Sequence, residues 1–139
     1  MKFLLVCIAL CLVNSLCMAA NEVDMKKTND VFKGKTSDVK ITFIGHASMM
    51  IENNNKVYHI DPWKDMGDYS KFPKADVIFV THEHFDHYDA DAIKMITKAD
   101  TKIVTTPTVA KEIANKSFVT VLSNGQNATV SQANRRSSL

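Results

Sequence analysis

Cysteine is nearly absent from this chain of 139 residues. The three cysteines that occur, Cys7, Cys11 and Cys17, all lie within the first 20 residues. The rest of the chain therefore has no disulfide and no thiolate ligand for a metal. Any metal site after residue 20 has to be built from histidine and carboxylate side chains.

An excess of charge of one sign is also missing. The chain has 17 lysines and arginines against 15 aspartates and glutamates, a formal net charge of +2. This balance gives no reason to expect nucleic acid or an anionic membrane as a partner. Hydrophobic residues make up 45% of the chain and charged residues 23%, which indicates one ordinary globular domain.

No hydrophobic run is long enough for a membrane span. The first stretch, "MKFLLVCIALCLVNSLCMAA", has one lysine, an apolar run and small residues at its end. This pattern is typical of a secretory signal peptide. We expect residues 1–20 to be removed after Ala19 or Ala20, and the protein to be secreted or periplasmic. A lipoprotein is the weaker alternative, because Leu16 stands before Cys17 where a lipobox has a small residue.

The pattern after this leader predicts a layered domain. Residues 21–38 are polar and aperiodic, and we interpret them as a linker or an irregular N-terminal segment. Strands are predicted at 39–45, 47–52, 56–61, 76–80, 102–106, 118–122 and 127–130, and helices at 89–99 and 107–116. This order gives an α/β or α+β layered domain over residues 39–130, followed by an irregular tail, 131–139.

Turn and cap residues add detail to this prediction. The turn "NNN" favours an antiparallel meander of the first three strands, and "SNGQ" favours a hairpin of the last two. Asp89 and Thr106 are the predicted N-caps of the two helices, with Pro107 at the first position of the second. Residues 62–75 hold two prolines and a glycine and are expected to form a loop.

The stretch "THEHFDHYD", residues 81–89, carries the chemistry. It follows the apolar run "DVIFV" and spaces His82, His84 and His87 at i, i+2 and i+5, with Asp86 among them. This is not the i, i+4 spacing of helical ligands, and it suits a loop leaving the end of a strand, where open α/β sheets place their sites. Three histidines within six residues are hard to assign to packing. The sequence therefore predicts a metal site made of these four side chains.

The same stretch resembles the His-x-His-x-Asp-His signature of the metallo-β-lactamase superfamily. The segments "ITFIGHASMMIE" and "HIDPW" resemble the branch that includes L-ascorbate-6-phosphate lactonases and N-acyl-phosphatidylethanolamine phospholipase D-like hydrolases. The resemblance covers about residues 39–130. It implies an αββα sandwich, of which this chain carries the N-terminal half, with one or two zinc ions, or manganese or iron in their place.

The resemblance also implies roles for the predicted ligands. His82 and His84 would hold the first metal, and Asp86 and His87 the second. The implied reaction is metal-assisted hydrolysis of an ester, lactone, amide or phosphodiester in a small-molecule substrate. In it, Asp86 orients or deprotonates the attacking water.

Residues outside the stretch receive roles in the same way. Asp61 matches an aspartate that ends an earlier strand and braces the site from behind the ligands. His46 matches a position near the active site, where it would contact substrate, although a structural role is equally open. For Trp63, the sequence is equally compatible with lining the entrance to the substrate site and with packing alone. His59 is expected to be structural.

The chain departs from the superfamily pattern in its second half. That pattern needs further histidines and a bridging aspartate there. This chain has no histidine after His87 and no aspartate after Asp100, and Glu112 is its only later carboxylate side chain. We therefore expect an incomplete hydrolase that binds zinc weakly and self-associates through an uncovered sheet face. The alternatives are a zinc-binding module and an inactive fragment, both without turnover.

Overall fold

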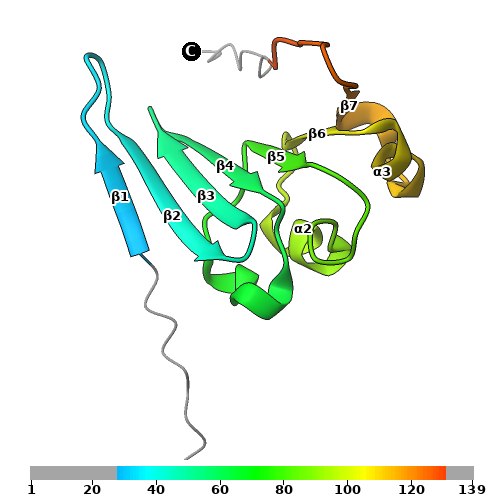
Figure 1. The fold of residues 1–139 in the computed structure, drawn as a ribbon, viewed down its shortest axis with the longest axis horizontal. Coiled ribbons are helices and arrows are strands. Elements are labelled where there is room, and N and C mark those ends of the chain that lie inside the picture. The colour runs from blue at the N-terminus through cyan, green and yellow to red at the C-terminus, as the bar shows by residue number, and fades with distance from the viewer. Residues whose placement is uncertain (1–27, 131–139) are drawn as a thin grey trace, which may run out of the picture.

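A computed structural model describes residues 28–130, which form one seven-stranded sheet with its strands in chain order, and helices packed on it (Figure 1). The strands are β1 (Thr28–Phe32), β2 (Val39–Gly45), β3 (Ser48–Asn53), β4 (Lys56–Ile60), β5 (Val77–Val80), β6 (Lys102–Thr105) and β7 (Val119–Val121). The helices are α2 (Ala90–Ile96) and α3 (Pro107–Glu112), with 3₁₀ helices η1 (Lys64–Met66), η2 (Tyr69–Lys71) and η3 (Lys116–Phe118). The predicted signal peptide and tail lie outside the described residues.

The meander and the helix starts predicted from sequence are confirmed. Strands β2, β3 and β4 pair antiparallel, and β5 and β6 add to them in parallel. The side chain of Asp89 accepts hydrogen bonds from the backbone N–H groups of Asp91 and Ala92, and Thr106 caps α3 with Pro107 at its first position. These caps satisfy N–H groups that have no partner within the helix. Both helices are shorter than predicted.

Two elements differ from the sequence-based expectation. Residues 28–32, within the segment interpreted as a linker or irregular, form β1 and pair antiparallel with β2. The strand was missed because an edge strand has one open side and need not alternate polar with apolar residues. The predicted C-terminal hairpin is wrong, since β7 pairs in parallel with β6 and residues 127–130 form no strand. Helix α3 carries the chain across to that parallel position.

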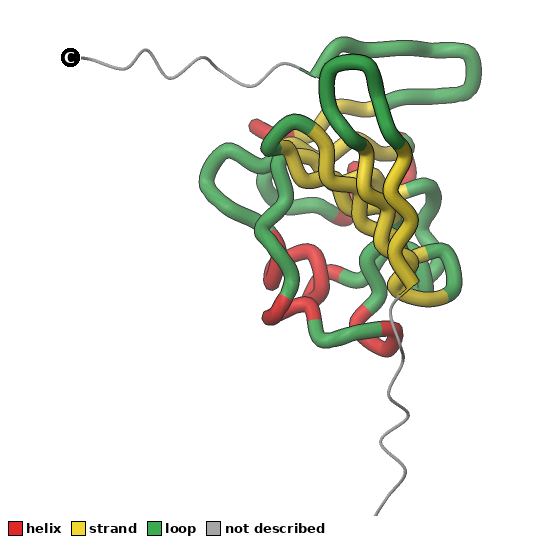
Figure 2. Tube along the Cα trace, turned by 90° about the vertical axis from the view of Figure 1, so that its left-hand side faces the viewer, coloured by secondary structure: helices red, strands yellow, loops and turns green. Residues whose placement is uncertain are grey.

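One face of the sheet carries the core, and the helices lie against it (Figure 2). Ile78 at the centre of β5, Ile96 of α2 and Val109 of α3 are all 0% exposed there. Tyr69 of η2 is 1% exposed. Burying one such aliphatic side chain contributes about 1.5–3 kcal/mol. This packing holds the carboxyl end of β5, and the loop that leaves it, in a fixed place.

The opposite face of the sheet is apolar and only partly covered. The pairing register aligns two rows of side chains across the strands: Phe43, Met49, Ile60, Phe79 and Val104 in one, and Ile41, Ile51, Tyr58 and Val77 in the other. Phe43 is 42% exposed, and most of the others are half-buried. We call these two rows the open face. Over residues 28–130, helices are too short or too polar to cross a bilayer.

His59 on β4 is a polar side chain buried within the core. It is 0% exposed, its Nε2 lies 3.1 Å from the carbonyl oxygen of Pro73, and its ring contacts the rings of Tyr69 and Phe72. Its Nδ1 has no hydrogen-bond partner among the described residues. Burial lowers the pKa of His59, and this effect outweighs the hydrogen bond to Pro73 and the charge of Glu52, which raise it. The imidazole is therefore neutral in the fold, as its expected structural role requires.

Acid should therefore destabilise the fold through His59. Because the folded pKa lies below the ordinary value of 6.5, the unfolded chain binds more protons as pH falls through that value, and stability falls by at most about 1.4 kcal/mol per pH unit. Urea unfolding at about pH 7.5 and about pH 5.5 measures the loss, in a window above the ordinary carboxylate range. A His59→Gln variant should lose less stability between the two pH values. An equal loss in the variant would contradict the assignment.

Candidate metal centre

The predicted metal-binding stretch forms a tight turn directly after β5. The backbone N–H groups of His87 and Tyr88 both donate to the carbonyl oxygen of His84, at 2.9 and 2.8 Å. The chain therefore leaves the strand end extended and then folds back on itself. This turn returns His87 to the strand end and leaves Tyr88 beside the start of α2.

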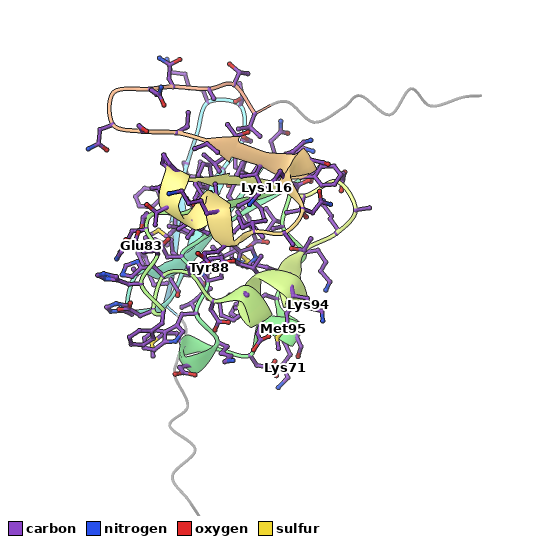
Figure 3. The ribbon with its side chains drawn as sticks, turned by 90° about the vertical axis from the view of Figure 1, so that its right-hand side faces the viewer. Lys71, Glu83, Tyr88, Lys94, Met95 and Lys116 are labelled. Carbon is purple, nitrogen blue, oxygen red and sulfur yellow. The ribbon has the colours of Figure 1, made fainter. Side chains whose placement is uncertain are left out.

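The three histidines of this stretch lie against one another. The ring centroid of His82 lies 4.6 Å from that of His84 and 3.9 Å from that of His87. Glu83 lies between His82 and His84 in the chain, and its side chain is exposed (Figure 3). Imidazole rings this close bring together several nitrogen donors of the kind that zinc accepts.

A fourth histidine joins the cluster from a distant turn. His46 lies between β2 and β3, where the backbone has positive φ at both Gly45 (152°) and His46 (51°). A Cβ at Gly45 would lie 2.8 Å from Sδ of Met66, so the close turn requires glycine. The turn places His46 Nε2 2.9 Å from Oδ2 of Asp86. One ligand atom from each of His46, Asp86 and His87 lies within 4.8 Å of the others.

Asp61 lies beneath this cluster, at the end of β4. Its carboxylate is 2% exposed and accepts hydrogen bonds from the backbone N–H of Thr81 at 2.8 Å and from the Thr81 hydroxyl at 2.7 Å. His87 Nδ1 lies 2.8 Å from Asp61 Oδ2. Because an ionised carboxylate only accepts hydrogen bonds, His87 carries its proton on Nδ1 and turns Nε2 toward the cluster.

The hydrogen bonds of Asp86 favour its ionised form. Partial burial raises the pKa of this carboxyl, but the hydrogen bonds from its own backbone N–H and from His46 outweigh that effect. With the charges of His87 and His46, they lower the pKa below its ordinary value. Asp86 is therefore a carboxylate at neutral pH, ready to bind a cation or accept a proton.

Aromatic side chains border the cluster on one side. The ring of Trp63 lies 5.6 Å from that of His46 and 5.8 Å from that of Phe85, both edge to face. Phe85 is 75% exposed. Sequence reasoning assigned no role to Thr81 or Phe85, although both lie inside the motif that it singled out. Their contacts reach Asp61 and Trp63 on other segments, which the spacing of residues along the chain does not show.

The donor set fits a divalent metal ion. Imidazole nitrogens and a carboxylate converge, and one histidine is oriented through its other nitrogen by a buried carboxylate, as metal-ligating histidines usually are. His46, Asp86 and His87 are the residues whose ligand atoms already meet, with His82 and His84 adjacent. The assignment of individual ligands stays a prediction.

Residues 40–137 match the model of the beta-lactamase superfamily domain, and the chain belongs to this family. The resemblance of its motif to the metallo-β-lactamase signature is therefore confirmed. The mixed sheet with helices on one face agrees with the predicted α/β fold of that family.

Three relatives define the similarity further. A crystal structure of a putative metal-dependent hydrolase from Parabacteroides distasonis shares 40% identity with a TM-score of 0.68, covering 72% of this chain and 44% of that one. A UPF0173 metal-dependent hydrolase of Korarchaeum cryptofilum is 35% identical over 56% of this chain and 37% of its own. N-acyl-phosphatidylethanolamine-hydrolyzing phospholipase D 1 of Caenorhabditis elegans is 30% identical over 45% of this chain and 22% of its own. The chain thus spans less than half the length of each relative.

Proposed function

We propose that this chain carries the metal-binding part of a secreted metal-dependent hydrolase, and that its metal is zinc. The convergence of His46, Asp86 and His87 carries the proposal, because a catalytic zinc usually has three protein ligands and an open position. Relatives named as metal-dependent hydrolases support a divalent ion, and the apolar leader over residues 1–20 supports export.

The residues of the cluster have different chemical roles in this proposal. A divalent ion held here would supply Lewis acidity toward a substrate oxygen and would lower the pKa of water. Asp61 holds the proton on His87 Nδ1, so that Nε2 can act as a ligand. Asp86 is ionised and can accept a proton at a carboxylate oxygen. Trp63 and Phe85 border one side of the cluster.

The proposed substrates are small esters, lactones or phosphodiesters, the classes that the superfamily resemblance implies. A second function, zinc binding without turnover, is favoured by one observation. Within the described residues the converging ligand atoms come from three side chains, which suffices for one ion but leaves a second with His82 and His84.

Metal content separates these possibilities from an inactive fragment. We expect the purified protein to bind about one equivalent of zinc, because the three converging ligands hold a single ion. We expect dialysis against a mild chelator to remove this ion. His46→Ala should weaken zinc binding by about tenfold or more, and Glu83→Gln, in the loop after β5 but outside the set of converging ligand atoms, should not. Calorimetric titration with zinc and with manganese measures the number of ions bound and the affinity of each variant. Two tightly retained ions, or no difference between the variants, would contradict the proposed site.

Turnover then separates the hydrolase from the zinc-binding module. The assay uses p-nitrophenyl esters and bis(p-nitrophenyl) phosphate with zinc or manganese added, for the wild type, Asp86→Ala and Glu83→Gln. If the chain is a hydrolase, the wild type is active, Asp86→Ala abolishes the activity and Glu83→Gln leaves it unchanged. Retention of zinc with no activity in any variant would support the module instead. From the incomplete ligand set we expect the rates to be low.

A further inference from the structure

A cleft of about 360 Å³ opens beside the metal-binding cluster. Its walls come from the loop after β4, from the turn after β5 and from the start of α2. We call it the Trp63 cleft, and its lining residues are Trp63, Lys64, Asp65, Phe85, Tyr88, Asp89, Ala90 and Asp91. Trp63 also contacts His46, so the cleft and the cluster share a wall. A molecule whose reactive group reached the cluster would place its next substituent here.

Aromatic side chains form one wall of the Trp63 cleft. Trp63 and Phe85 meet edge to face at 5.8 Å, and Tyr88 continues the wall toward α2. In Figure 3, Tyr88 is seen between Glu83 and the residues of α2. Phe85 is 75% exposed, so its ring is accessible to a ligand in the Trp63 cleft. Aromatic faces attract both flat apolar groups and organic cations.

The rim of the Trp63 cleft decides between those two kinds of ligand. The lining holds the exposed carboxylates of Asp65 and Asp91 and the buried carboxylate of Asp89, which caps α2, against the single ammonium of Lys64. Lys64 Nζ pairs with Asp91 at 2.7 Å, and its backbone N–H donates to Asp89 at 3.0 Å. Hydrogen bonding to Asp91 and the charges of Asp91, Asp89 and Asp65 raise the pKa of Lys64. The rim therefore already stabilises one ammonium, and a net negative charge remains.

We propose that the Trp63 cleft binds an organic ammonium group, with the cation against Trp63 and Phe85 and its charge balanced by Asp65. Calling this group part of the substrate rests on the hydrolase function proposed above, whereas the binding itself does not. The favoured substrate is then an ester or phosphodiester whose alcohol or acyl part ends in an alkylammonium. An anionic substituent is disfavoured here, because the rim would repel it.

The chain supplies its own probe for this proposal. Trp63 is its one tryptophan, so intrinsic fluorescence reports on the Trp63 cleft directly. The full chain, without added metal, is titrated with choline, with its neutral isostere 3,3-dimethylbutan-1-ol, and with propionate. We expect choline to change the Trp63 emission saturably and to bind at least about tenfold more tightly than the neutral alcohol. Propionate should produce no saturable change.

Matched variants test the parts of the site. Asp65→Asn keeps the shape of the side chain and removes one charge, and it should weaken choline binding by about threefold or more. The control Asp68→Asn removes an exposed carboxylate outside the Trp63 cleft and should leave choline binding unchanged. Phe85→Leu keeps an apolar residue without the ring and should also weaken binding. Lys64→Met removes the ammonium group already present in the cleft and should strengthen choline binding.

The outcomes separate this proposal from the hydrolase proposal. Equal affinity for choline and the neutral alcohol would show an apolar cleft, and absence of saturable change with all three ligands would show no site; either result overturns the ammonium assignment. Because the titration needs neither metal nor turnover, choline binding by a protein that hydrolyses nothing would retain the Trp63 cleft and reject the hydrolase.

Discussion

Asp61→Ala should destabilise the domain by about 1–3 kcal/mol and abolish zinc binding. The carboxylate of Asp61 is 2% exposed and accepts hydrogen bonds from the backbone and the hydroxyl of Thr81 and from His87 Nδ1. Alanine would leave these three donors without their acceptor; the His87 ring is half-buried, whereas Thr81 is exposed and its two donors can turn to water. It would also release the His87 ring, which then need not present Nε2 to the cluster. Urea unfolding and calorimetric zinc titration measure the two losses separately.

A matched pair of variants tells charge from backbone effects at this position. Asp61 has φ of +43°, a conformation that asparagine tolerates better than alanine. Asp61→Asn should therefore cost less stability than Asp61→Ala while still impairing zinc binding. Thr81→Val removes one of the two Thr81 hydrogen bonds and should cost about 1 kcal/mol. An Asp61→Ala protein as stable as the wild type, with zinc affinity unchanged, would show that Asp61 does not support the site.

The second large effect concerns the open face of the sheet. We propose that it packs against the same face of a second copy of this chain, giving a dimer with two-fold symmetry. The two apolar rows span five strands and contain no charged side chain, so a second copy meets no buried charge. Phe43 is exposed and six other members of the rows are half-buried, so a second copy would remove apolar surface from water.

The ends of one row favour this arrangement. The row of Ile41, Ile51, Tyr58 and Val77 is flanked by Asp30 on β1 and by Lys102 on β6. A two-fold axis parallel to the strands reverses the order of the strands in the second copy. It therefore brings the strand positions of Asp30 in one copy and Lys102 in the other opposite each other, twice in each dimer. Lys102 Nζ lies 4.8 Å from the centroid of the Phe118 ring in its own chain and would have to turn from it to pair with Asp30.

Light scattering coupled to gel filtration tests the dimer. The wild type should dimerise, and Ile51→Lys, which puts a charge in the middle of the open face, should be monomeric. Asp30→Lys and Lys102→Asp should each weaken the dimer, and the double variant should restore it, because the pair is then reversed. Circular dichroism of each variant checks that it folds. A monomeric wild type, or a double variant no better than the single ones, would contradict the proposal.

Local signals in the sequence were sufficient for several elements. The apolar and β-branched residues of β2 to β6 and the capping side chains of Asp89 and Thr106 act on their immediate neighbours in the chain, so pattern and turn chemistry located these elements. The His-x-His-x-Asp-His spacing of the loop after β5 was equally local. It predicted the metal-binding stretch and the family, and the match over residues 40–137 confirms the family.

Only the tertiary structure decided what lies far apart in sequence. The hydrogen bond between His46 and Asp86 joins residues 40 positions apart, and that between Asp61 and His87 joins residues 26 apart. Both depend on parallel and antiparallel pairing that brings several strand ends to one edge, which no local pattern encodes. The same holds for β7, whose sequence suits a hairpin or a parallel strand equally well. The sequence thus determined which side chains could bind a metal, and strand pairing determined which of them meet.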